Sequence, residues 1–148
     1  YCDKGGNAQD IIIMQRLLKN GTTVYAKVVE NELIRAEAER ICTAFKPVGP
    51  LNIQMRLNGG GVPICFELNV RFSGSTAMRA NFGFCDVEAA IREYLFGNSI
   101  DECFHVRHGE AFRYDNELYL FGNPTEAMSK DKKINSMAAF AVTYDCSL

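Results

Sequence analysis

The feature that most constrains the fold is the alternation of apolar and polar residues between positions 50 and 72. Two alternating runs, 50–57 and 62–72, are separated by the segment Asn-Gly-Gly-Gly. A period of two is typical of strands that turn one face to a core and the other to water. A short glycine-rich turn between two such runs joins neighbouring antiparallel strands. The sequence therefore predicts a hairpin with two chemically different faces.

The second run of this hairpin places Glu67, Asn69 and Arg71 on one face. On the first run, Gln54 is expected to share that face as a diagonal neighbour of Glu67, about 7–8 Å away at the backbone. The opposite face is expected to form a core from four apolar side chains: Phe66, Leu68, Val70 and Phe72.

The polar face suits a hard metal cation and phosphate. The side-chain oxygens of Gln54, Glu67 and Asn69 are ligands for Mg²⁺ or Mn²⁺ and poor ligands for zinc or copper. With one carboxylate, this set would bind free Mg²⁺ weakly, so a metal that already carries polyphosphate oxygens fits it better. Arg71 would supply a guanidinium for a phosphate. An ordinary solvated strand face has the same pattern, and the Ser-Gly-Ser segment that follows also fits a plain turn.

The remaining elements predict an α+β fold. Strands are expected over 10–18 and 24–29, with a helix from the N-cap Asn31 to about Phe45. A short helix is expected near 76–82, and strand pieces within 104–121. Because hairpin-linked strands alternate with helices, we expect a largely antiparallel sheet with helices packed on one face.

The last part of the chain carries weaker signals. Asp86 is expected to cap a helix that Gly97 closes, with Tyr94 and Leu95 in its core stripe. Beyond residue 121, a charged helix is expected at 125–133 and an apolar segment at 137–144.

Composition narrows the function classes. The 148 residues carry a net charge of −2, so a basic footprint for nucleic acid is absent from the sequence. Its apolar runs are too short for a bilayer span and its start is unlike a signal peptide, which favours a cytoplasmic location. The six cysteines contain no Cys-x-x-Cys pair, which favours reduced thiols over disulfides or a zinc site. A start at Tyr1 without methionine is expected of a fragment.

The stretch FELNVRFSGS resembles the signature strand of the ATP-grasp superfamily, in particular the carbamoyl-phosphate-synthase-like carboxylate–amine ligases. That strand reads Glu-x-Asn-x-Arg followed by small residues, here Glu67, Asn69, Arg71, Ser73, Gly74 and Ser75. Gln54, in GPLNIQ, stands where the family has a metal ligand on the preceding strand. Val70 stands where the family commonly has proline. The resemblance covers residues 1–121.

The resemblance implies that residues 1–121 are the C-terminal lobe of an ATP-grasp domain, with 122–148 an extension of uncertain structure. It implies ATP and Mg²⁺ (or Mn²⁺) as cofactors, with the metal on Gln54, Glu67 and Asn69. ATP phosphates would lie against Arg71 and the loop Ser73–Gly74–Ser75, and Arg16 would join Arg71 as a catalytic residue. Arg79, on the short helix, would point toward this region. The implied reaction activates a carboxylate as an acyl-phosphate for attack by an amine or similar nucleophile.

The same resemblance implies that an earlier lobe, which grips the α- and β-phosphates and reads adenine, is absent from this chain. The expected partners are therefore a nucleotide, a small carboxylate substrate and the missing N-terminal lobe, with no nucleic acid and no membrane. Alone, the chain is expected to be incomplete and inactive, and self-association into a homodimer would cover its exposed face. Two alternatives stay open: a non-catalytic ATP-grasp-derived binding or regulatory domain, and a generic α+β interaction module.

Overall fold

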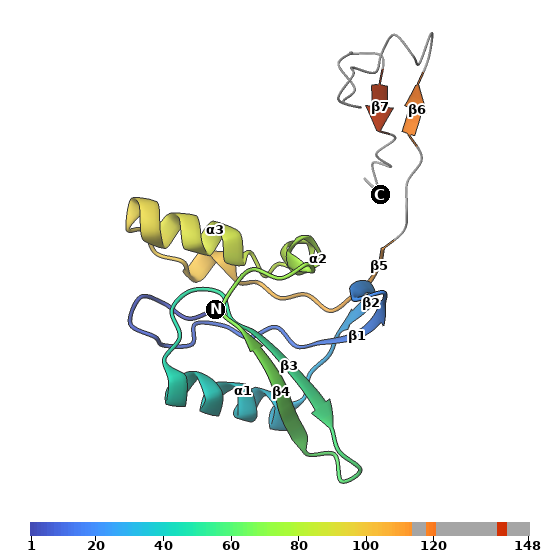
Figure 1. The fold of residues 1–148 in the computed structure, drawn as a ribbon. Coiled ribbons are helices and arrows are strands. Elements are labelled where there is room, and N and C mark those ends of the chain that lie inside the picture. Colours follow the sequence, from blue (N-terminus) through green and yellow to red (C-terminus); the bar gives the residue numbers. More distant parts are fainter. Residues whose placement is uncertain (114–117, 121–138, 142–148) are drawn as a thin grey trace. The chain divides into compact units, whose positions relative to one another are not determined.

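The computed structural model of the chain describes residues 1–113, 118–120 and 139–141, and its fold is mixed α+β with antiparallel strand pairs (Figure 1). The chain divides into two compact units, Tyr1–Arg113 and Tyr114–Leu148. In the second unit, β6 (Leu118–Leu120) pairs antiparallel with β7 (Ala139–Ala141). The helix predicted at 125–133 lies outside the described residues, as does most of the segment 137–144.

The first unit holds two separate small antiparallel sheets in place of the one larger sheet that was predicted. The three-stranded sheet has the order β1 (Met14–Lys19), β2 (Thr22–Val28), β5 (Glu110–Phe112). The two-stranded sheet is the predicted hairpin, β3 (Asn52–Leu57) with β4 (Pro63–Asn69). The helical elements are α1 (Glu32–Phe45), α2 (Thr76–Asn81), α3 (Asp86–Ile91), η1 (Arg92–Phe96) and η2 (Asp101–Cys103).

The β1–β2 hairpin forms around an Asn-Gly turn. Asn20 and Gly21 have φ values of 50° and 75°, the left-handed pair that a two-residue turn between twisted strands requires and that Asn-Gly adopts most easily. The second strand, predicted over 24–29, is confirmed as β2. The first was predicted from residue 10, but β1 begins only at Met14.

The predicted helix after Asn31 is confirmed. The Oδ1 atom of Asn31 accepts the N–H of Ile34 at 3.0 Å, and α1 ends where Lys46 adopts a left-handed φ of 46°. Such an N-cap satisfies one of the free N–H groups of the first turn. Pro47, which follows, cannot continue the helix. Helix α1 runs along one side of the β3–β4 hairpin (Figure 1).

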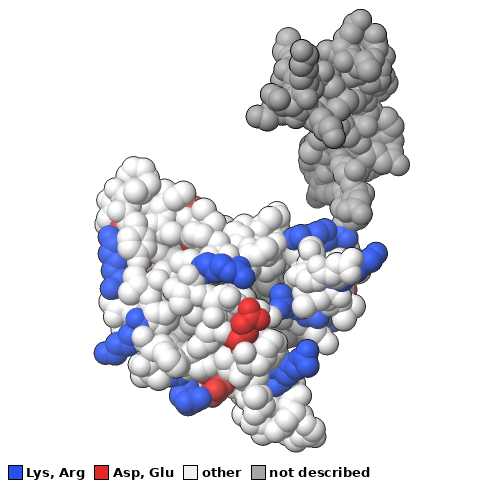
Figure 2. Space-filling model, viewed as in Figure 1, with Lys and Arg blue, Asp and Glu red and all other residues white. Residues whose placement is uncertain are grey.

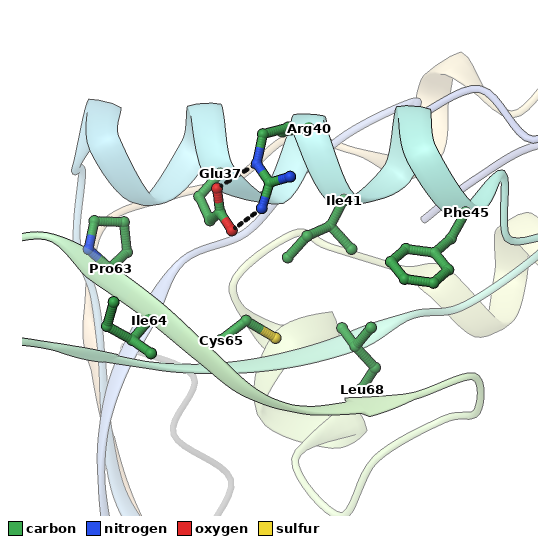
Figure 3. Close-up of a pocket in the computed structure, with 8 residues that line it drawn as sticks. All are labelled: Glu37, Arg40, Ile41, Phe45, Pro63, Ile64, Cys65 and Leu68. Atoms are coloured by element: carbon green, nitrogen blue, oxygen red, sulfur yellow. Dashed lines mark hydrogen bonds and ion pairs between the residues drawn. The ribbon is translucent and has the colours of Figure 1, made fainter.

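A groove of about 320 Å³ lies between α1 and β4. In Figure 3, Ile41 and Phe45 of the helix point toward Cys65 and Leu68 of the strand. Cys65 and Leu68 reach the same side although they are three residues apart. A shift in the pairing register explains this, because Gln54 pairs with Glu67 whereas Met55 pairs with Cys65. Phe66 is thus the extra residue of a β-bulge.

The prediction that Phe66, Leu68, Val70 and Phe72 form a core was wrong. These side chains are exposed, with Val70 at 65 % and Phe66 at 54 %. The bulge breaks their alternation, and the ladder ends at Asn69, three residues earlier than predicted. The pairing of β3 with β4 ends at Asn52 and Asn69, so Val70 and Phe72 lie beyond the ladder.

The buried core of the first unit lies around α3. Its central cluster contains Tyr1, Phe84, Ala89, Ile100 and Cys103. The short helix near 76–82 is confirmed as α2, and the next helix ends at Gly97, which has a φ of 66°. The five described cysteines are free thiols: Cys2, Cys42, Cys65, Cys85 and Cys103. None of the helices in the described ranges is long and apolar enough to cross a bilayer.

Two predictions about the α3 region were wrong. Asp86 does not cap the helix: Cys85 is the N-cap, α3 has no side-chain cap bond, and Asp86 is its first residue. Tyr94 and Leu95 are not in the core, since they are 45 % and 74 % exposed. They lie in η1, a π-helical turn, whose wider winding displaces side chains from the stripe that a regular α-helix would form.

Gly83 is expected to tolerate no side chain. Its φ is 86°, and a β-carbon there would overlap the carbonyl oxygen of His105. We expect Gly83→Ala to lower the free energy of unfolding by about 2–5 kcal/mol, from left-handed strain plus overpacking. Gly21, with a φ of 75° and open space around it, is the matched control, and Gly21→Ala should cost only about 1–2 kcal/mol. Urea unfolding of both variants measures the difference, and equal losses would contradict the steric explanation.

Candidate functional site

Strand pairing brings the three predicted metal ligands together on the β3–β4 hairpin. Gln54 lies directly opposite Glu67, not diagonal to it, and Asn52 lies opposite Asn69. Directly opposite residues are closer than diagonal ones, about 4.5–5.5 Å between β-carbons. The Nδ2 atom of Asn69 donates to Oε1 of Glu67 at 2.8 Å. Gln54, Glu67 and Asn69 therefore form one cluster of oxygen donors, hereafter the oxygen cluster.

Arg16, predicted as a catalytic residue, reaches this cluster from the other sheet. It lies on β1, and its guanidinium donates to Oε1 of Gln54 through Nη2 and to Oγ1 of Thr23 through Nη1, the latter at 3.4 Å. Arg16 and Gln54 are 38 residues apart in the sequence. The contact places one positive charge beside the oxygen cluster.

Arg71 does not join the cluster within the described part of the chain. It lies beyond the end of β4, where its backbone N–H bonds to the carbonyl of Asn69 at 3.0 Å. Its Nη1 donates to the carbonyl of the adjacent Phe72, also at 3.0 Å. The strand geometry that was predicted to align Arg71 with Glu67 thus ends before Arg71.

The Ser-Gly-Ser loop after the hairpin is built over a buried arginine. Arg79 of α2 is 7 % exposed. Its Nη1 donates to the hydroxyls of Ser73 and Ser75, and its Nη2 donates to Thr76 and to Oδ2 of Asp86. Asp86, at 2 % exposed, completes a buried ion pair. Arg79 therefore fixes the loop from inside.

A second arginine fixes the same loop from the outside. Nη2 of Arg113 donates to the carbonyl of Gly74 at 2.8 Å. The sequence suggested Arg79 as a neighbour of this region, but the role of Asp86 was missed. Its position at the start of a helix predicted a cap, and no local pattern signals that an acid will pair with an arginine seven residues earlier.

Several of these side chains line one cavity of about 880 Å³, within the size range of small-molecule sites. Its polar lining includes Arg16, Gln54, Glu67, Ser75, Arg79 and Asp86, together with Asp10, Gln15, Glu30, Asn31, Asn52 and Arg56. Much of the remaining wall is apolar and includes Ile11–Met14, Ile34 and Leu51. Asn69 and Arg71 are not among its lining residues. Gln54 and Glu67 of the oxygen cluster and the buried Arg79–Asp86 pair thus line a common cavity.

The arrangement of ionisable side chains among the described residues limits which metals and charged ligands this region could bind. Among them, no group of three or more His, Cys, Asp or Glu is arranged to hold a metal, so a thiolate or imidazole zinc site is not formed there. Figure 2 shows lysines and arginines spread over the visible face without merging into one basic patch. At the cavity wall, burial and a hydrogen bond to Glu93 raise the pKa of the Tyr1 hydroxyl, which keeps it neutral.

Comparisons with known proteins give no family for this chain. No protein-family model matches it, and no curated protein matches it.

Proposed function

We propose that this chain supplies the metal- and phosphate-facing half of the active site of an ATP-dependent ligase of the ATP-grasp type. The ligase would activate a small carboxylate as an acyl-phosphate, which an amine or similar nucleophile then attacks. One observation carries the proposal: strand pairing places Gln54 opposite Glu67 at a cavity that Arg16 also lines, and Asn69 bonds to Glu67 from beside it. On this proposal residues 1–121 are the C-terminal lobe of the ATP-grasp domain.

The donor set fits Mg²⁺ or Mn²⁺. It contains a carboxylate and two amide oxygens, all hard ligands. The bond from Asn69 to Glu67 uses the amide nitrogen, so the amide oxygen of Asn69 remains free for a metal. When bound, the metal would neutralise charge on the β- and γ-phosphates.

Arg16 would have one role before the metal binds and another after it. Its guanidinium bonds to the same Gln54 oxygen that a metal would take. Ligation by Gln54 would therefore release Arg16, and a guanidinium in this position suits a phosphate or the developing acyl-phosphate. On this proposal Arg71 and the Ser73–Ser75 loop bind phosphate only after Arg71 leaves the carbonyl of Phe72.

A titration with Mn²⁺ tests the proposal on the 148-residue chain. Because one carboxylate holds a divalent cation weakly, we expect weak Mn²⁺ binding without nucleotide and markedly tighter binding when ATP is present. Electron paramagnetic resonance measures free Mn²⁺ in both series, and the Mn²⁺ bound by the same ATP concentration without the chain is subtracted. Mn²⁺ affinity that ATP leaves unchanged would contradict the proposal.

An interaction domain is the second candidate. The observation that favours it is the row of exposed apolar side chains on and after β4, including Ile64, Leu68 and Val70. In an ATP-grasp enzyme the same surface would be covered by the earlier lobe or by a second copy of the chain. The Mn²⁺ titration separates the two functions, since an interaction domain has no use for nucleotide-dependent metal binding.

A further inference from the structure

The chain contains two Asn-Gly pairs, Asn20–Gly21 and Asn58–Gly59. One pair lies in the turn of the β1–β2 hairpin and the other in the turn of the β3–β4 hairpin. Both asparagines are exposed, and a β-carbon added to Gly21 or Gly59 would contact nothing within 4 Å. The two pairs are therefore alike in sequence, exposure and open surroundings.

The hydrogen bonds of the two asparagine side chains differ. Oδ1 of Asn58 accepts the N–H groups of Gly60 and Val62, both at 2.9 Å, whereas no described residue bonds to the side-chain amide of Asn20. The amide of Asn58 is thus held against its own turn, and that of Asn20 rotates in solvent.

The backbone nitrogen that follows each asparagine is also accessible. The N–H of Gly21 lies in the turn between the paired residues Lys19 and Thr22 and donates to no described backbone carbonyl. The same is true of the N–H of Gly59. The nucleophile is therefore equally available in both turns, and only the side-chain amide distinguishes them.

An asparagine followed by glycine can cyclise. The backbone nitrogen of the glycine attacks Cγ of the asparagine, and the side-chain nitrogen leaves as ammonia, which carries away the proton of the glycine amide. Water then opens the cyclic imide at one of its two carbonyl groups, which gives either aspartate or isoaspartate. Glycine favours the attack because it has no side chain and leaves the backbone free to turn.

We infer that Asn20 is a site of spontaneous deamidation, and that its isoaspartate product loosens the β1–β2 hairpin. Asn58 is protected from the same reaction, because its side-chain amide must first leave two backbone N–H groups before Cγ can meet the nitrogen of Gly59.

Isoaspartate changes the length of this turn. Its main chain runs through the former side-chain methylene group and so gains one carbon atom. A two-residue turn fixes the register of the strands that it joins, so the pairing of Lys19 with Thr22 next to it would no longer align. Arg16 lies further along β1, so the disturbance runs toward the residue that bonds to Gln54. The aspartate product keeps the turn, since Asp-Gly is also favoured there.

Mass spectrometry tests the site on the folded 148-residue chain. The chain is kept at neutral pH in water labelled with heavy oxygen and is then digested at acid pH in ordinary water. Hydrolysis of the imide in the folded state incorporates the label, which separates it from any reaction during digestion. We expect Asn20 to deamidate about tenfold faster than Asn58 or more, the equivalent of the hydrogen bonds that Asn58 must give up.

The chain in concentrated urea is the control, because unfolding removes the bonds that protect Asn58. The two asparagines should then react at similar rates. Equal rates in the folded chain, faster reaction at Asn58, or no reaction at Asn20 over the time that the unfolded chain needs would overturn the inference. The same difference persisting in urea would also overturn it, since the cause would then be local sequence.

Hydrogen exchange tests the effect on the hairpin. The isoaspartate form, separated by chromatography, is compared with Asn20→Asp, which has the same charge without the extra carbon. We expect the ladder amides of β1–β2 to exchange about tenfold faster in the isoaspartate form, with those of β3–β4 unchanged. Equal exchange of the β1–β2 amides in the two proteins would contradict the loosening of the hairpin.

Discussion

Glu67→Gln is expected to reduce the ATP-dependent affinity for Mn²⁺ by about 100-fold or more, since loss of a supporting outer-shell partner alone costs about 10–100-fold. Glu67 is the only carboxylate in the oxygen cluster, and glutamine has nearly the same size and shape. The substitution therefore removes charge and leaves the strand pairing with Gln54 in place. If the proposed ligase function holds, the same variant in the complete enzyme should lose ADP formation by orders of magnitude.

The control for this variant is Glu110→Gln. Glu110 is an exposed strand residue of β5, paired with Lys27 at 3.1 Å and not among the residues that line the cavity. It should leave Mn²⁺ affinity unchanged. Nearly normal Mn²⁺ binding by the Glu67 variant, measured by the same resonance titration, would remove the metal role from the hairpin.

Asp86→Ala is expected to cause the largest loss of stability, about 3–5 kcal/mol, because it leaves the buried guanidinium of Arg79 without its counter-charge. Total stabilities of domains are about 5–15 kcal/mol, so this variant should unfold at a much lower urea concentration. The loss should also loosen the Ser73–Ser75 loop, since the same guanidinium holds both serine hydroxyls.

Glu88→Ala provides the comparison. Glu88 forms an exposed pair with Arg92 at 2.7 Å on the same helical stretch, and exposed pairs contribute about 1 kcal/mol or less. Equal urea midpoints for the two variants would show that the Arg79–Asp86 pair is not stabilising the buried network.

The hairpin shows where sequence patterns sufficed and where they did not. The glycine-rich turn and the alternation predicted two antiparallel strands, but the direct pairing of Gln54 with Glu67, predicted as a diagonal contact, depends on the bulge at Phe66. The bulge at Phe66 was not predictable, because the residue types of a strand do not show where its pairing register shifts. The shift moves the residues after the bulge to the opposite face relative to those before it. The exposure of Val70 has a different origin, since the β3–β4 ladder ends one residue before it, at Asn69.

In the loop after the hairpin, the sequence analysis missed a contact between two separate helices. The sequence predicted the short helix and placed Arg79 near the site, but it assigned Asp86 to a cap. A cap is a local interaction, whereas the observed pair depends on how α2 and α3 pack. Burial then favours the ion pair over the cap, because a buried guanidinium needs a counter-charge.

By itself, the sequence determined the local features: the Asn20–Gly21 turn, the helix begun by Asn31, the helix closed by Gly97 and the mixed α+β class. Each depends on backbone preferences and on residues a few positions apart. Only the tertiary structure decided which polar groups meet, as for Arg16 with Gln54 and Arg79 with Asp86. Such contacts join separate elements, and their energy depends on burial that no short stretch of sequence contains.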